Sequence, residues 1–155
     1  MWGSGSGSVT NGVRRGFAFN SGSVTQERLF GLEEANSLVP LLQRTFEAAM
    51  PVVTRLRTVL EALERGRPND TELLEERSTL TRQVERLLKP LEELGLDVKS
   101  ADGLVDFHAT RAGRLVNLCW RFPETEIAFW HDLESGFAGR QRIKGPDEFE
   151  VSLLC

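Results

Sequence analysis

The stretch from Gly103 to Arg142 reads GLVDFHATRAGRLVNLCWRFPETEIAFWHDLESGFAGRQR, and apolar and polar residues alternate along much of it. A period of two is typical of β-strands that bury one face. Two such runs, 104–109 and 115–122, flank Gly113, which suits the turn of a hairpin. The pattern predicts a small three-stranded antiparallel β-meander over residues 103–131.

The second run also predicts which face of the sheet is buried. Alternate positions form an apolar face that can pack on helices, namely Val116, Leu118, Trp120 and Phe122. Asn117, Cys119 and Arg121 fall on the opposite face, which we expect to be more open. The third strand is expected at 126–130, with a loop over 132–143 after the meander.

Residues 32–94 carry the apolar spacing of two α-helices. Steps of four and three residues connect Leu42, Phe46, Ala49, Val53, Leu56, Leu60 and Leu63. A second series contains Leu73, Leu80, Val84, Leu87, Leu91 and Leu94. Two heptad seams joined by a short connector predict a long, coiled-coil-like antiparallel helical hairpin.

Two local signals predict where these helices begin. Pro40 cannot continue a preceding helix, so a break is expected near Leu38-Val39. Asn69, with Glu72 three residues later, resembles a capping box and predicts the start of the second long helix.

The chain as a whole is predicted to adopt an α+β fold, with one domain over residues 30–143 in which the hairpin packs beside the meander. Residues 1–29 are rich in glycine and serine and are expected to form an extended tail. Residues 144–155 form a second tail.

Composition excludes several classes of protein. The chain has 155 residues and a net charge of −4, and no concentrated basic face is evident, so nucleic acid is not expected as a partner. No segment approaches the roughly 20 consecutive apolar residues of a membrane span. Two cysteines are too few for a disulfide framework, which favours a cytoplasmic location.

Several motifs resemble those of a small bacterial family of unknown function. They are Phe30-Gly-Leu-Glu-Glu-Ala-Asn36, Gly103-Leu-Val-Asp-Phe107, Leu118-Cys-Trp120 and a W-H-x-L-x-x-G-F-x-G-R ending over 130–140. The resemblance covers roughly residues 30–143. It implies a shared fold and a bacterial origin, and it carries no catalytic roles because no activity is established for that family.

The polar residues of the last third favour no particular reaction. Zinc sites usually contain ligands paired at short fixed spacings, and none occurs, so His108, His131 and Glu134 are weak candidate ligands. No helix N-terminus that could lower the pKa of the Cys119 thiol is evident near it among the predicted elements, so the sequence does not favour Cys119 as a nucleophile. We therefore expect neither enzyme activity nor a cofactor.

An interaction role accounts for more of the features. We expect a non-catalytic accessory or scaffolding subunit that binds a larger bacterial protein complex, or another copy of itself, through its hairpin and tails. The candidate contact residues are Phe17, Phe19, Trp130, His131, Phe137, Arg140, Leu153 and Leu154. Arg140 is expected to pair with Asp132, Glu134 or a partner's carboxylate. The alternative is a small ligand- or metal-binding protein that uses His131, Asp132 and Glu134.

Overall fold

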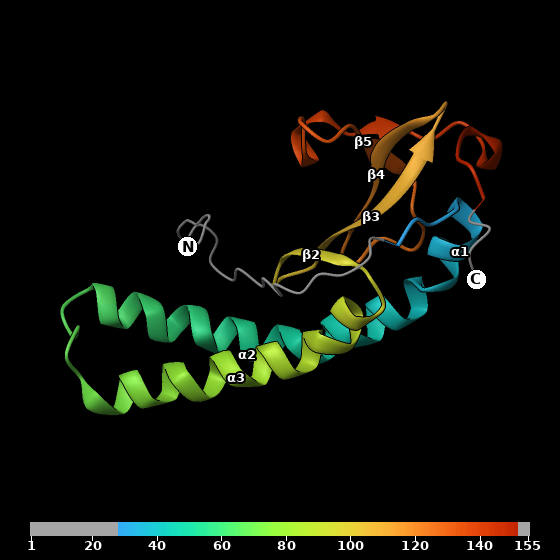
Figure 1. Ribbon diagram of the computed structural model, residues 1–155. Coiled ribbons are helices and arrows are strands. Elements are labelled where there is room, and N and C mark those ends of the chain that lie inside the picture. The colour runs from blue at the N-terminus through green and yellow to red at the C-terminus, as the bar shows by residue number, and fades with distance from the viewer. Residues whose placement is uncertain (1–27, 152–155) are drawn as a thin grey trace.

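The computed structural model describes residues 28–151, of which the first half is helical (Figure 1). Three helices follow one another: α1 (Leu32–Ser37), α2 (Val39–Glu64) and α3 (Thr71–Glu93). The break between α1 and α2 falls at Leu38, which confirms the effect expected of Pro40. Helix α3 is capped by Asp70, whose side chain accepts a hydrogen bond from the Leu73 amide at 3.1 Å, so the predicted cap at Asn69 was wrong by one residue.

Helices α2 and α3 lie side by side as the predicted hairpin, with one correction to its seam (Figure 1). Val59 is buried in α2, whereas Leu60, which was predicted to be buried, is 42% exposed. In α3, Leu88 is buried and the predicted Leu87 only partly so. A helix has 3.6 residues per turn, so residues three and four positions further on lie near the same face. Where two neighbouring residues are both apolar, the spacing alone does not decide which of them is buried in the seam.

The second half forms one antiparallel sheet of five strands. In spatial order these are β2 (Asp97–Ser100), β3 (Leu104–Arg111), β4 (Arg114–Arg121), β5 (Phe129–His131) and β6 (Gln141–Arg142). The α+β class is therefore confirmed, and the predicted count of three strands was wrong. The two extra strands, β2 and β6, are four and two residues long and have almost no apolar alternation. They form because they pair with β3 and β5, and their own sequence does not indicate it.

One face of the sheet packs on the helices as predicted. Val116, Leu118 and Trp120 belong to the main core, and the Trp120 ring lies 5.8 Å from that of Phe46 on α2. The expectation that the opposite face is open was wrong for Asn117 and Cys119, both of which are buried. Asp106 on β3 and His131 on β5, the two adjacent strands, lie within 4.8 Å of the Cys119 sulfur and are buried with it.

Buried apolar side chains form two separate clusters. The main cluster joins the sheet to the parts of α2 up to Val53 and of α3 from Val84 onward. A smaller cluster at the far end of the hairpin contains only Leu56, Val59, Leu63 and Leu80 as buried members. Figure 1 shows this end of α2 and α3 extending past the sheet.

Gly103 joins β2 to β3 at a point where the backbone approaches Phe122. Its φ is +112°, and a Cβ atom there would lie 2.4 Å from the Cβ of Phe122. Its carbonyl also accepts a hydrogen bond from the Phe122 amide at 2.8 Å, which fixes this approach.

We expect Gly103→Ala to lower the free energy of unfolding by about 2–3 kcal/mol, because it adds a steric overlap to an unfavourable φ. Urea unfolding followed by circular dichroism measures the change. Gly113→Ala is the matched control, since Gly113 also has a positive φ (+77°) but nothing lies within 4 Å of its Cβ position. Equal costs at the two glycines would contradict the steric explanation.

The chain folds back onto the β3–β4 hairpin after β6. A short 3-10 helix, η2 (Pro146–Glu148), precedes Phe149, which is buried against Trp130. The Glu150 amide donates a hydrogen bond to the Thr110 carbonyl at 2.9 Å. The predicted contact residues Phe17, Phe19, Leu153 and Leu154 lie outside the described residues. Within residues 28–151, none of the helices has the length and apolar character that crossing a membrane requires.

Candidate functional site

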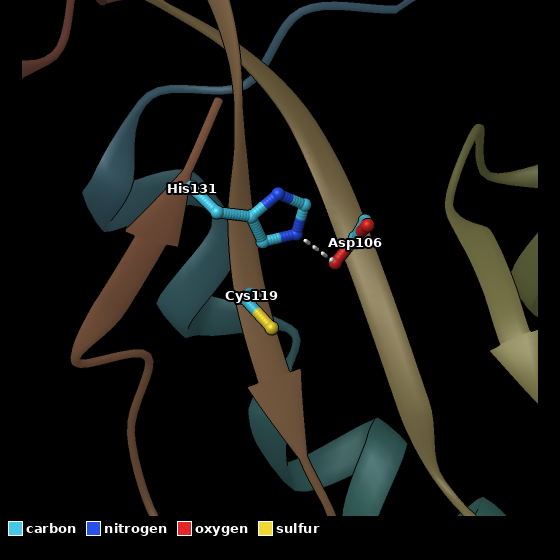
Figure 2. A group of neighbouring side chains, drawn as sticks. All are labelled: Asp106, Cys119 and His131. Atoms are coloured by element: carbon cyan, nitrogen blue, oxygen red, sulfur yellow. Dashed lines mark hydrogen bonds and ion pairs between the residues drawn. The ribbon is translucent and has the colours of Figure 1, made fainter. Parts of the chain in front are cut away.

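Three chemically different side chains meet on the face of the sheet opposite the helices: Asp106 from β3, Cys119 from β4 and His131 from β5 (Figure 2). Asp106 lies directly across from Cys119 in the β3–β4 register, and the His131 ring reaches over β4 toward Asp106. All three residues are at least 98% buried. Burial of a carboxyl, a thiol and an imidazole together is costly unless they interact, so this cluster is the candidate site.

Hydrogen bonds fix the orientation of the His131 ring. Nδ1 lies 2.7 Å from the carbonyl oxygen of Asp132, and Nε2 lies 3.2 Å from Oδ1 of Asp106. A carbonyl oxygen can only accept, so Nδ1 carries a proton. Nε2 therefore faces Asp106 with one shared proton, either as imidazolium beside a carboxylate or as imidazole beside a carboxylic acid. Burial raises the pKa of Asp106, while the charge of His131 and its hydrogen bond act in the opposite direction.

Cys119 lies beside this pair as a protonated thiol. Burial, followed by the nearby Asp106, raises the pKa of Cys119 to about 12. Both ring nitrogens of His131 already face other groups, so neither is positioned to take the thiol proton. The arrangement differs from a nucleophilic cysteine–histidine pair, in which the imidazole accepts the proton of the thiol.

A metal ion is a second possible use of the same atoms. One donor atom from each of Asp106, Cys119 and His131 lies within 4.8 Å of the other two, and among the described residues they form the only such group. Of the predicted metal ligands it includes His131, whereas His108 and Glu134 lie outside it. His108 pairs instead with Oδ1 of Asn117 through Nδ1, at 2.9 Å.

The segment after β5 forms a tight turn organised by Asp132. Its Oδ1 accepts hydrogen bonds from the amides of Glu134 and Ser135 and from the Ser135 hydroxyl, and these bonds lower its pKa. Gly136 has a φ of +62°, and the short helix η1 (Phe137–Gly139) follows. Asp132 is thus engaged in the turn, and Glu134 is exposed to solvent.

Arg140 attaches the end of this segment to the sheet. Its Nη2 donates to both carboxylate oxygens of Glu124 at 2.9 Å and lies 3.3 Å from the carbonyl oxygen of Cys119. The guanidinium also lies 4.1 Å from the ring centroid of Phe129 and 4.6 Å from that of Phe137. The expected pairing of Arg140 with Asp132 or Glu134 was wrong. Asp132 accepts hydrogen bonds within the turn, and Arg140 lies beside the end of β4, where it pairs with Glu124.

The remaining predicted contact residues differ in accessibility. Trp130 is 8% exposed and belongs to the main core, on the face opposite His131. Phe137 is 42% exposed. A partner could therefore touch Phe137 directly, while Trp130 and His131 lie beneath the surface.

One protein family matches most of the described part of the chain. The model of a family described as uncharacterised conserved proteins, DUF2203, matches residues 28–143. The chain belongs to the DUF2203 family. No curated protein and no solved structure is similar enough to this DUF2203 chain to count as a match. The matched range confirms the resemblance predicted over residues 30–143, and all three residues of the buried cluster fall in motifs on which that resemblance rests.

Proposed function

We propose that this DUF2203 protein is a non-catalytic accessory or scaffolding subunit that binds another protein through the free end of its helical hairpin. The observation that carries the proposal is the separate small cluster at that end, Leu56, Val59, Leu63 and Leu80. The sheet and α1 are packed without it, so this part of the hairpin is longer than the main core requires.

The surface of the free end suits a protein partner. Between Thr54 and Gln83 the chain has six arginines and six acidic residues, so the charge is mixed and balanced. Arg55 on α2 and Glu76 on α3 form a two-bond ion pair, with distances of 2.6 and 2.8 Å, which links the two helices. Leu60 adds an apolar side chain to the exposed surface of α2. A surface of balanced charge that also exposes a leucine favours protein over nucleic acid as the partner.

The proposal is tested by the mass of the native assembly. We expect the untagged protein, purified from its own cells at natural abundance, to have a mass greater than one chain by native mass spectrometry. Leu60→Glu should remove the additional mass, because it replaces the exposed apolar side chain of the proposed contact with a charge.

Leu133→Glu provides the matched control, since Leu133 is 53% exposed and belongs to the turn after β5. That variant should retain the assembly. A wild-type protein that is a lone monomer at natural abundance would overturn the proposal, as would an equal effect of the two substitutions.

The alternative function, binding of a small ligand or metal ion through His131, Asp132 and Glu134, has uneven support. Asp132 already accepts three hydrogen bonds within its own turn, and Glu134 points into solvent. His131, by contrast, has two further candidate ligands beside it, Asp106 and Cys119.

A further inference from the structure

The ring of His131 is held as a metal-binding histidine usually is. Such a histidine donates its second ring N–H to a carbonyl or carboxylate, which orients the other nitrogen toward the metal. Nδ1 of His131 makes this bond to the Asp132 carbonyl at 2.7 Å, and Nε2 points to the space shared with Asp106 and Cys119 (Figure 2). The Asp132 carbonyl thus holds the imidazole in the orientation that metal binding requires.

The spacing of the nitrogen and oxygen donors suits a small tetrahedral ion. Zinc binds nitrogen and oxygen ligands at roughly 2.0–2.1 Å, which places two ligands of a tetrahedral site about 3.3 Å apart. Nε2 of His131 and Oδ1 of Asp106 are already 3.2 Å apart, and the sulfur of Cys119 completes a group within 4.8 Å. Three protein ligands are a number that zinc sites use, with the fourth position taken by another molecule.

Charge and ligand chemistry narrow the choice of metal. A thiolate and a carboxylate carry two negative charges, which balance a divalent cation and leave the buried site neutral. Sulfur and imidazole ligands disfavour Mg²⁺ and Ca²⁺, whose ligands are oxygens, and suit Zn²⁺. We propose that Asp106, Cys119 and His131 form a zinc-binding site on the sheet face of this protein.

The site is independent of the proposed partner surface at the free end of the hairpin. On binding, Zn²⁺ replaces the proton of the Cys119 thiol and the proton shared by His131 and Asp106, and these protons pass to solvent. Because the three donors come from β3, β4 and β5, the ion would tie three adjacent strands together.

The test uses the untagged full chain with zinc alone. We expect one equivalent of zinc per chain after equilibration with Zn²⁺ and gel filtration, measured by elemental analysis. Cobalt in place of zinc should give the sulfur-to-cobalt charge-transfer absorption of a thiolate ligand. Cys119→Ser and His131→Gln should each weaken binding at least about 100-fold, since loss of an outer-shell partner alone costs 10–100-fold.

The chain supplies its own controls, because it has two histidines and two cysteines. His108→Gln and Cys155→Ser keep the three proposed ligands and should leave the stoichiometry and the cobalt spectrum unchanged. If the wild-type chain binds no zinc, or binds cobalt without the thiolate absorption, the proposal is overturned whether or not the ligand variants fold. Equal losses in Cys119→Ser and Cys155→Ser would overturn it as well.

Discussion

Replacing Trp120 with alanine is expected to lower the free energy of unfolding by about 3–5 kcal/mol, the usual cost of removing a large buried aromatic side chain. Trp120 has no exposed surface, and its ring packs against Phe46 at 5.8 Å and Phe122 at 6.2 Å. Its Nε1 also donates a hydrogen bond to the Glu124 carbonyl at 2.9 Å. The substitution therefore leaves a cavity between helix and sheet and removes one of the two donors to the Glu124 carbonyl, the other being the Gln43 side chain.

Urea unfolding monitored by circular dichroism measures this loss. Trp120→Phe separates the two contributions, because it retains much of the ring and removes the hydrogen bond, and should cost about 1–2 kcal/mol. Leu133→Ala, at a largely exposed position, should change stability by no more than about 0.5 kcal/mol. A Trp120→Ala chain as stable as Leu133→Ala would show that the helix–sheet contact is not where the stability lies.

Replacing His131 with alanine is expected to cost about 3 kcal/mol in metal-free protein, the low end of the range for breaking a buried pair. Removal of the imidazole leaves Asp106 buried without its partner and the Asp132 carbonyl without its donor. The cost stays at the low end because burial already raises the pKa of Asp106, so the carboxyl can take up a proton once His131 is gone.

Unfolding in the presence of a chelator measures the effect of the pair without any metal. His108→Ala is the matched control, since its hydrogen bond to Asn117 is half-buried and should be worth about 1 kcal/mol. A double-mutant cycle with Asp106→Asn should show coupling with His131 of at least about 1 kcal/mol. Additive effects would mean that the two side chains do not interact.

The pairing of Asp106 with Cys119 could be predicted from the sequence. A turn at Ala112-Gly113 pairs Arg111 with Arg114, and counting back along both strands brings Asp106 opposite Cys119. Alternation then places both on one face, although Leu118 and Trp120 draw attention to the other. The tight turn that fixes the register was the available signal.

The position of His131 could not be predicted in the same way. The connection between β4 and β5, residues 122–128, is too long and irregular to fix how these two strands pair. Local sequence therefore does not predict that His131 lies opposite Asn117. The partner of Arg140 also follows from tertiary structure, because Glu124 is close in space only once β4 and β6 are in place. Such contacts depend on how distant segments of the chain pair, and the local pattern of apolar and polar residues does not indicate that pairing.

The free end of the hairpin also has a consequence for motion. Between Val53 and Val84, the two helices are held together by four buried leucine and valine side chains, by the partly buried Leu73 and Leu74, and by the Arg55–Glu76 ion pair. Local opening needs only the energy of the contacts that it breaks, so an opening of this end would leave the contacts of the sheet and of the buried cluster intact. A protein that binds there would raise the opening free energy of the hairpin end alone, and the occupied and empty states would differ in local dynamics with the same fold.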